Sequence, residues 1–197
     1  MEGFKFDPEK LDKLNDPERL KDIPPGFIWK KLAVKQSGTV VDLGAGTGFF
    51  SMQFAGMPGI KKVYALDISP AMVEYMQSRV NPEYPAIIPM IMEESTVPLS
   101  DDTADVLIMI NLHHEFHAPH AILSECIRVL KPGGKIAIVD WTKKDTEHGP
   151  PVEKRYHSEE VIEQLQTLPF IHIQSFYDLP SHFLLVAENG KLYFDMH

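Results

Sequence analysis

The chain has a single cysteine among its 197 residues, so it can form no internal disulfide. Scarce cysteine is typical of proteins in reducing compartments, and we expect a cytoplasmic location. The one thiol, Cys126, lies at helical spacing from Ile122, Leu123 and Leu130. This pattern predicts a buried structural cysteine rather than a nucleophile.

Long apolar runs are also absent. No stretch approaches the roughly 20 apolar residues that a membrane-spanning helix needs, so we expect no membrane span. The first residues are charged and mixed, unlike a secretory leader. Positive charge is scarce as well: the formal net charge of −9 predicts no general attraction to nucleic acid. The length suits a single domain, residues 1–197, with a core of its own.

The most informative segment is residues 40–48, where an apolar strand runs into closely spaced glycines. Gly44, Gly46 and Gly48 predict a tight turn, and the apolar residues after them predict the start of a helix. A strand that turns into a helix in this way directs unpaired backbone N–H groups at one spot. That spot suits an anionic or strongly polar ligand.

The spacing of these glycines excludes two common phosphate-binding loops. No Gly-Lys-Ser/Thr follows, as a P-loop requires. The dinucleotide fingerprint is G-x-G-x-x-G, and Phe49 occupies the place of its third glycine, where a bulky ring argues against a pyrophosphate. Asp67 ends the next apolar run, where a carboxylate can accept both hydroxyls of a ribose. Together they indicate a nucleoside-containing cofactor that is not a dinucleotide.

From Thr39 onward the pattern alternates strand and helix. The expected strands are 39–43, 62–67, 86–91, 105–111, 135–141, 171–176 and 183–187, and the expected helices lie near 49–56, 70–80, 119–130 and 158–167. The last two strands have no helix between them. Alternating βα units that end in a hairpin predict an α/β fold with a Rossmann-like, seven-stranded, mostly parallel sheet. We expect its last strand to be antiparallel and helices to cover both faces.

Three motifs carry a resemblance to a known family. They are VVDLGAGTG at 40–48, ALDISPAM at 65–72 and RVLKPGGKIAIVD at 128–140. In this order and spacing they resemble motif I, motif II and the fifth-strand segment of class I S-adenosylmethionine-dependent methyltransferases. The chain is most similar to the small-molecule branch that includes the ubiquinone and menaquinone biosynthesis enzymes. The resemblance implies S-adenosylmethionine as cofactor and a small-molecule methyl acceptor.

The resemblance also implies roles for individual residues around the cofactor. The residues that border its amino acid end, ribose and adenine face are Asp42, Gly44, Ala45, Gly46, Asp67 and Ile68.

In the resemblance, an acidic residue after the third strand meets the adenine amino group. Counting back from Pro98 gives Glu93, and Glu94 is the alternative. Asn111 ends the fourth strand, where its side chain should face the cofactor.

The segment after Asn111, which reads LHHEFH, offers candidates for catalysis. Methyl transfer requires a base only when the acceptor must lose a proton, and the family has no universal catalytic residue. His113 or His114 could be that base near neutral pH, and the alternative for each is packing within the loop. The Asn/Asp-Pro-Pro-Tyr/Phe motif of enzymes that methylate nucleic acid bases or glutamine is absent. A small-molecule acceptor therefore remains the expectation.

A metal site is the competing interpretation of the same segment. His113, His117 and His120 would share one face of a continuous helix. However, the H-E-x-H spacing is not the H-E-x-x-H zinc motif, and Pro119 interrupts any such helix. We therefore expect no metal.

The segments that flank the core suggest how an acceptor is covered. We divide the chain into an N-terminal helical cap (1–35), a cofactor-binding core (36–140), a polar insertion (141–157) and a helix with a terminal hairpin (158–197). If the insertion is a substrate lid rather than a surface loop, Trp141, Tyr156 and His157 are its expected acceptor contacts. Two other functions stay open: a nicotinamide-dependent oxidoreductase, and a nucleoside-cofactor-binding module without catalysis.

Overall fold

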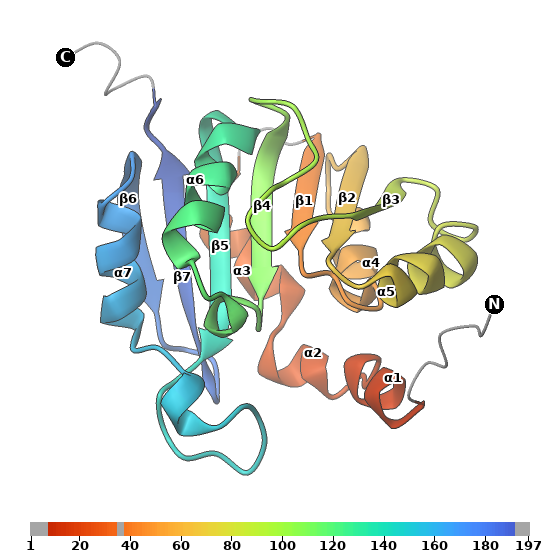
Figure 1. The fold of residues 1–197 in the computed structure, drawn as a ribbon, viewed down its shortest axis with the longest axis horizontal. Coiled ribbons are helices and arrows are strands. Elements are labelled where there is room, and N and C mark those ends of the chain that lie inside the picture. The colour runs from red at the N-terminus through yellow and green to blue at the C-terminus, as the bar shows by residue number, and fades with distance from the viewer. Residues whose placement is uncertain (1–7, 35–37, 192–197) are drawn as a thin grey trace.

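The structure is a computed structural model that describes residues 8–34 and 38–191. Within these residues, seven strands form one sheet in the order β3-β2-β1-β4-β5-β7-β6 (Figure 1). Their bounds are Thr39–Leu43 (β1), Lys62–Asp67 (β2), Ile87–Ile91 (β3), Ala104–Ile110 (β4), Leu130–Trp141 (β5), Phe170–Phe176 (β6) and His182–Asn189 (β7). Strand β7 is antiparallel to both of its neighbours, and the other strand pairs are parallel. The predicted fold class is confirmed.

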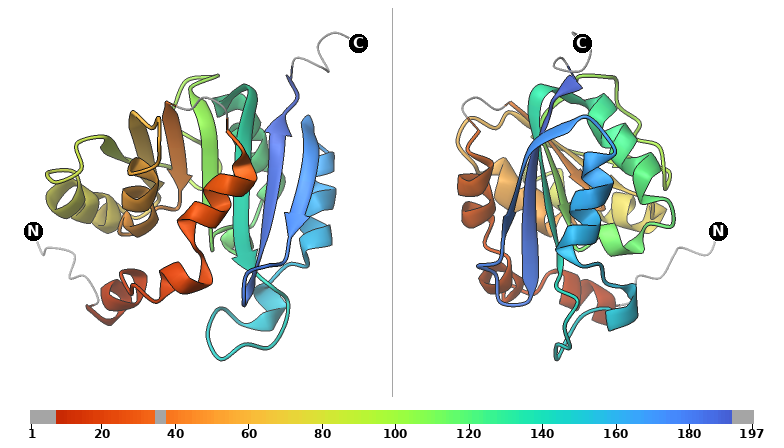
Figure 2. Two further views of the ribbon diagram at one scale, coloured as in Figure 1. Left: turned by 180° about the vertical axis from the view of Figure 1, so that it is seen from behind. Right: turned by 90° about the vertical axis from the view of Figure 1, so that its left-hand side faces the viewer.

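Helices cover both faces of this sheet (Figure 2). They are α3 (Pro25–Leu32), α4 (Phe49–Ala55) and α5 (Pro70–Tyr75) on one face, and α6 (Pro119–Val129) and α7 (Ser158–Gln166) on the other. The short helices α1 (Pro8–Leu14) and α2 (Arg19–Asp22) lie beyond one end of the strands (Figure 1). None of the helices in the described part of the chain is long and apolar enough to cross a bilayer.

Strand β4 illustrates why the central strands are apolar throughout. Leu107 and Met109 belong to the apolar cluster under α6 and α7, whereas Val106 and Ile108 belong to the cluster under α3, α4 and α5. All four side chains are fully buried. Because successive side chains point to opposite faces and both faces are covered, the strand has no polar side to alternate with.

Strand β5 begins at Leu130, five residues before the predicted start. Leu130 pairs with Ala104 and Lys135 pairs with Val106, so residues 131–134 form an excursion inside the strand. Gly133 lies in this excursion with a φ of +75°, a conformation that favours glycine. The Pro-Gly-Gly turn therefore interrupts β5 instead of preceding it.

The helix expected over 70–80 is α-helical only as far as Tyr75. It continues as a π turn, Met76–Val80, in which the N–H of Asn81 donates to the carbonyl of Met76 at 2.8 Å. The side chain of Met76 is fully buried and packs beside Gly48, where an added Cβ would lie 3.2 Å from its sulfur. The π turn thus contacts the glycine loop that follows β1.

The order of the strands creates a crevice. Strands β2 and β3 lie on one side of β1, and β4 and β5 lie on the other, so the loops after β1 and β4 diverge at the carboxyl ends of adjacent strands. Figure 1 shows α1, α2 and the segment after β5 at this same edge. Ligands bind at such a switch point in open α/β sheets.

His182 lies buried near this edge, at the start of β7. It pairs with Trp141 of β5, and the centroids of the two rings are 4.2 Å apart. The residue is 1% exposed, and neither ring nitrogen has a hydrogen-bond partner among the described residues. Burial lowers the pKa of His182 to about 4, although the charge of Asp140 opposes the shift.

This buried imidazole makes the stability of the fold depend on pH. In the unfolded chain a histidine takes up its proton near pH 6.5, whereas folded His182 resists protonation down to about pH 4. As the pH falls through this window the unfolded state binds more protons, which costs about 3 kcal/mol of stability. We expect His182→Phe, which keeps a ring beside Trp141, to gain stability relative to the wild type between pH 7 and pH 4.5.

Urea unfolding of both proteins at several pH values tests this expectation, because the difference between them cancels the other titrating groups. His120→Gln, at an exposed position, is the matched control and should follow the wild type. The prediction would be contradicted if the free energies of unfolding of His182→Phe and the wild type changed in parallel with pH.

Candidate functional site

The loop after β1 depends on backbone conformations that favour glycine. Gly44, Gly46 and Gly48 have φ values of +68°, +57° and +79°. A Cβ on Gly44 would lie 2.6 Å from Cδ1 of Leu112, the second residue after β4. A side chain at position 44 would therefore need a left-handed backbone and would displace the side chain of Leu112.

Asp67, at the end of β2, closes this loop from the other side. Its Oδ2 accepts a hydrogen bond from the N–H of Gly46, and its Oδ1 accepts one from the N–H of Ser69, both at 2.8 Å. Each carboxylate oxygen has a further lone pair, so the group can also accept hydroxyls of a ligand. The adjacent Ile68 is 61% exposed and offers apolar surface next to this acceptor.

Asp42 is buried at the carboxyl end of β1. The hydroxyl of Ser51 in α4 donates to its Oδ2 at 2.6 Å. Burial raises the pKa of this carboxyl to about 7; the negative charge of Asp67 adds to the shift, while the Ser51 hydrogen bond and the charge of Arg19 oppose it. Near neutral pH the group therefore exchanges readily between its two charge states.

Arg19 of α2 belongs to the site but was not predicted from the sequence. Its guanidinium carbon lies 4.8 Å from the ring centroid of Phe50 and 5.5 Å from that of Phe49. With Asp42 and the glycine loop, it lines a hollow of about 260 Å³. Burial lowers the pKa of Arg19, and nearby carboxylates, Asp42 first, oppose the shift. The sequence feature that could have indicated Arg19 is the pair of adjacent phenylalanines, on which a guanidinium can stack.

A second hollow, of about 530 Å³, adjoins the first and extends toward β2 and β3. Asp67 and Ile68 line it, and so does Glu94, whose Oε1 accepts a hydrogen bond from the N–H of His117 at 3.3 Å. Glu93 is exposed, forms an isolated bridge with Thr96 and does not line the hollow. Of the two predicted acids, Glu94 is therefore the one beside this hollow.

Asn111 lies where the two hollows meet. It lines both of them and has a φ of +53°, which is unusual outside glycine. Its N–H donates to the carbonyl of Val139 at 2.8 Å, but its Oδ1 is buried with no partner in the described part of the chain. A buried oxygen without a partner is costly unless a ligand or a water supplies the missing donor.

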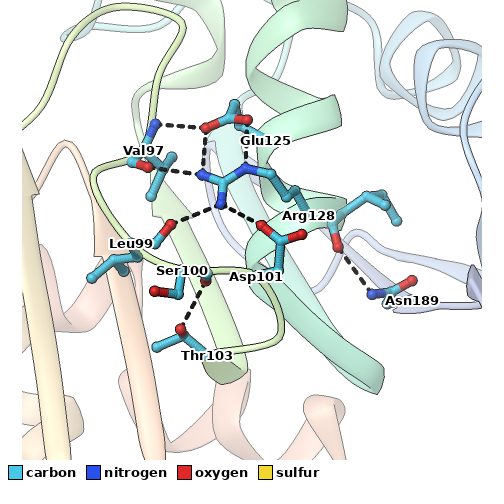
Figure 3. Close-up of polar contacts among 9 residues, drawn as sticks. Val97, Leu99, Ser100, Asp101, Thr103, Glu125, Arg128 and Asn189 are labelled. Atoms are coloured by element: carbon cyan, nitrogen blue, oxygen red, sulfur yellow. Dashed lines mark hydrogen bonds and ion pairs between the residues drawn. The ribbon is translucent and has the colours of Figure 1, made fainter.

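Arg128 of α6 fastens the segment that joins β3 to β4 (Figure 3). Its guanidinium donates to the carbonyls of Val97 and Leu99, at 2.8 and 2.7 Å, and to the carboxylates of Glu125 and Asp101. Glu125 in turn accepts a hydrogen bond from the N–H of Val97 at 2.9 Å. This network fixes the chain immediately after the wall of the second hollow.

His113 is a packed core residue. It is fully buried, and its ring makes edge contacts with Tyr156 and Phe116, at centroid distances of 5.0 and 6.4 Å. Burial lowers its pKa, against the opposing charge of Asp140. Its surroundings therefore favour the neutral form.

His114 is held by a carboxylate instead. The ring Nδ1 of His114 lies 2.7 Å from Oδ1 of Asp140. The backbone N–H of His114 donates to Oδ2 of the same aspartate at 2.9 Å. Burial opposes protonation of the ring, but the hydrogen bond and charge of Asp140, helped by Glu115, raise the pKa of His114 above its ordinary value. The two neighbouring histidines are thus shifted in opposite directions.

The segment after β5 is organised by Arg155. This arginine is 4% exposed and donates to the carbonyls of Pro150, Lys144 and Thr142 at 2.8, 2.7 and 3.2 Å. Its guanidinium carbon lies 5.3 Å from the ring centroid of Trp141. Trp141, a predicted acceptor contact, therefore packs against the segment and lines neither of the two hollows described above.

A third hollow, of about 500 Å³, lies beneath the same segment. Tyr156 lines it together with His114. His157 does not line this hollow. It is the N-cap of α7, and its backbone N–H donates to Oε2 of Glu160 at 2.6 Å. Of the three predicted acceptor contacts, Tyr156 is thus the one that lines this hollow.

The histidines considered as metal ligands do not share a helical face. Residues 113–115 form a 3₁₀ turn and α6 starts only at Pro119. His113 is buried, whereas His117 and His120 are exposed. Over residues 8–34 and 38–191, no group of three or more His, Cys, Asp or Glu side chains is arranged to hold a metal ion.

The chain is similar to known proteins in both sequence and structure. Residues 41–138 match the family model described as a methyltransferase domain. A crystal structure of an S-adenosylmethionine-dependent methyltransferase from Aquifex aeolicus is 34% identical in sequence, with a TM-score of 0.81; the match covers 93% of this chain and 99% of that one.

Two curated relatives are more distant or shorter in overlap. The ubiquinone/menaquinone biosynthesis C-methyltransferase UbiE of Cupriavidus taiwanensis is 27% identical over 175 residues, which are 85% of this chain and 68% of the relative. An uncharacterised methyltransferase-like protein of Schizosaccharomyces pombe is 30% identical over 121 residues, which are 61% of this chain. The match spans only 44% of that relative's length.

The Arg128 network should stabilise the site wall locally. Arg128→Met keeps the apolar stem and removes every hydrogen bond of the guanidinium, and we expect a loss of about 1–3 kcal/mol of unfolding free energy. In hydrogen exchange, the amide of Val97 should exchange faster while the amides of β1 keep their protection. Lys21→Met, which removes an exposed ion pair with Glu18, is the control and should change stability little. Unchanged exchange at Val97 would contradict the proposed fastening.

Proposed function

Because the chain belongs to the S-adenosylmethionine-dependent methyltransferases, we propose that it transfers a methyl group from S-adenosylmethionine to a small-molecule acceptor. The observation that carries this proposal is the set of groups at the switch point of the sheet. A carboxylate with spare lone pairs, an exposed apolar side chain and an unpaired amide oxygen border adjoining hollows. UbiE, a relative named for a small-molecule pathway, supports the choice of acceptor class.

The residues of the first hollow suit the amino acid end of the cofactor. Its ammonium group would meet the carboxylate of Asp42, and its carboxylate would meet the guanidinium of Arg19. The backbone at Gly44, Ala45 and Gly46 would border the chain between them. Opposite charges in one small, partly buried space favour a zwitterionic ligand.

The residues of the second hollow suit the nucleoside. Asp67 would accept the ribose hydroxyls, and Ile68 would pack on the adenine face. Glu94 would accept a hydrogen bond from the adenine amino group; Glu93, the residue before it, does not line this hollow. The unpaired Oδ1 of Asn111 lies between the two hollows, where the sulfonium would sit.

When bound, the cofactor supplies a methyl group that its sulfonium already activates. The protein then needs to align the acceptor with that methyl and to exclude water. Leu14 of α1 lines both cofactor hollows, so the N-terminal cap is suited to cover the cofactor. The segment fastened by Arg155 is suited to cover the acceptor.

The alternative of a nicotinamide-dependent oxidoreductase is not favoured. Phe49 stands in place of the third dinucleotide glycine, is buried at the start of α4 and packs against Phe50 at a centroid distance of 5.3 Å. A pyrophosphate would have to displace this ring from the helix N-terminus. A module that binds the cofactor without catalysis would share the site but would methylate no acceptor.

Calorimetry with S-adenosylhomocysteine tests the proposed cofactor site. The wild type should bind, and Asp67→Ala should bind about 10- to 100-fold more weakly, because hydrogen bonds to a charged group are lost. Glu163→Ala, at an exposed position on α7 that lines neither cofactor hollow, is the matched control and should bind like the wild type. NADH titrated into the same protein should give no heat of binding. Absence of S-adenosylhomocysteine binding would sink the proposal.

Cofactor affinity should also depend on pH through Asp42. Its carboxyl has a pKa of about 7 in the free protein, and a bound ammonium group favours the ionised form. Binding should therefore tighten by about tenfold between pH 6 and pH 8 and release a proton near neutral pH. Calorimetry in buffers of different ionisation enthalpy measures that proton. Asp42→Asn should bind with a flatter pH dependence and release fewer protons; equal proton release by both proteins would refute the role of Asp42.

A further inference from the structure

We propose that the methyl acceptor is a small acidic molecule, whose carboxylate or phosphate group binds in the third hollow against Arg155 and Lys154. This inference rests on the proposed methyl transfer and extends it to the acceptor. The third hollow adjoins the second, with which it shares Glu115, Phe116 and His117 as lining residues. A molecule in the third hollow therefore lies next to the proposed cofactor site.

Arg155 is a buried cation that has no carboxylate partner among the described residues. It is 4% exposed, and its guanidinium donates to backbone carbonyls, from Nε to Pro150 and from Nη1 to Thr142 and Lys144. Nη2 donates to the carbonyl of His148 at the long distance of 3.4 Å, which leaves its second N–H without a protein partner in this part of the chain. A buried charge is costly unless an opposite charge offsets it. An anionic ligand would supply that charge.

Lys154 adds a second positive charge to the same hollow. It ends the 3₁₀ turn Val152–Lys154, immediately before Arg155, and both residues line the hollow. The side chain of Lys154 is exposed and forms no ion pair within residues 8–34 and 38–191. A guanidinium N–H and an ammonium group together suit the oxygens of one carboxylate or phosphate.

The carboxylates of the third hollow do not cancel these two cations. Three of them line it, and two are already engaged with other side chains. Oε1 of Glu115 lies 3.3 Å from Nε2 of His114, and Oε2 of Glu160 lies 3.6 Å from Nζ of Lys143. Glu153 is the third, and it alone remains against two positive charges. The balance of the unengaged groups is therefore positive and favours an anion.

The walls of the third hollow are unsuited to a long apolar acceptor. Of the ten residues that line it, Phe116 is the only one without a charged or titratable side chain. Covering such groups with hydrocarbon would remove them from water at a high cost. The volume of about 500 Å³ instead suits a compact molecule, which the rings of Phe116 and Tyr156 could contact through its short body.

The position of the two cations separates the anionic group from the atom that is methylated. Neither Arg155 nor Lys154 lines the two cofactor hollows. The shared wall, residues 115–117, lies between them and the cofactor. The carboxylate or phosphate therefore anchors the acceptor, and a different atom of the molecule faces the methyl group.

The test uses matched acids and amides. Protein saturated with S-adenosylhomocysteine is titrated with benzoate, benzamide, succinate, succinamide, phenyl phosphate and a neutral prenylated hydroquinone, and amide chemical shifts are followed by NMR. We expect benzoate and succinate to bind about tenfold more tightly than their amides, because charge-assisted hydrogen bonds are made. The shifts should centre on Lys154 and Tyr156, and added salt should weaken the binding of the acids but not of the amides. Comparison of benzoate with phenyl phosphate distinguishes a carboxylate anchor from a phosphate anchor.

Lys154→Gln is the decisive variant, because it leaves every hydrogen bond of Arg155 in place. It should weaken the binding of the acids about three- to fivefold, as expected for an exposed charge, and leave the amides unaffected. Lys144→Gln makes the same change at an exposed position of the same segment that lines neither the third hollow nor the cofactor hollows. This control should bind the acids like the wild type. Both variants should bind S-adenosylhomocysteine within twofold of the wild type.

Arg155→Gln should weaken the binding of the acids about tenfold or more, because a charged donor is lost. This change also removes the anchor of the segment, so amide exchange over residues 142–150 must be measured with it. If the segment loses its protection, the result of Lys154→Gln decides.

Several outcomes would overturn the inference. They are amides that bind as tightly as the acids, an equal effect of Lys144→Gln and Lys154→Gln, shifts that lie away from the third hollow, and tighter binding of the prenylated hydroquinone than of any acid. Failure of the wild type to bind S-adenosylhomocysteine would instead refute the proposed function. The same acids titrated without S-adenosylhomocysteine would then still show whether the third hollow binds anions.

Discussion

The close approach of the loops after β1 and β4 is the constraint on which the site depends. Both loops leave adjacent parallel strands at one edge, and the side chain of Leu112 fills the space that a Cβ on Gly44 would take. At the same edge Gly46 donates to Asp67, and Asn111 has a left-handed backbone and an Oδ1 without a partner among the described residues. The glycine spacing in the sequence is therefore a requirement of packing as well as of ligand binding.

Two buried carboxylates at this edge are held differently, and their different settings suit different roles. Asp42 accepts a hydrogen bond from the hydroxyl of Ser51, and its raised pKa leaves it sensitive to the charge of a ligand. Asp140 accepts two backbone hydrogen bonds and a contact from His114, so it is fixed in place. A loosely satisfied carboxylate responds to what binds, whereas a fully bonded one orients its neighbour.

The sheet could be predicted because its determinants are local. The apolar runs of β1 and β4, the glycine turn and the helix-free hairpin at the end each follow from neighbouring residues. The start of β5 could not be predicted in this way, because Leu130 becomes part of the strand only by pairing with Ala104 of the neighbouring strand. The π turn after Tyr75 likewise follows from packing rather than from a local signal.

Within the site, the sequence predicted which kinds of side chain are present better than where each side chain points. The role of Asp67 could be predicted from its place at the end of an apolar run. The choice between Glu93 and Glu94 depends on which of these adjacent residues lies beside the hollow, and the sequence does not fix that. His157 and Trp141 have side chains suited to contact an acceptor. In the structure, however, His157 caps α7 and Trp141 packs against the buried Arg155. Arg19 reaches the site from a separate helix, and no sequence spacing encodes that distance.

The way Arg155 holds the segment after β5 has a consequence for how this protein can change. The guanidinium bonds backbone carbonyls, which every amino acid provides, and not the side chains of that segment. Most residues between Thr142 and Pro150 can therefore be exchanged while their anchor persists. Gly149 is an exception, because its φ is +112° and a Cβ there would lie 3.0 Å from the guanidinium of Arg155. Selectivity for the acceptor can drift in this segment without a matching redesign of the core.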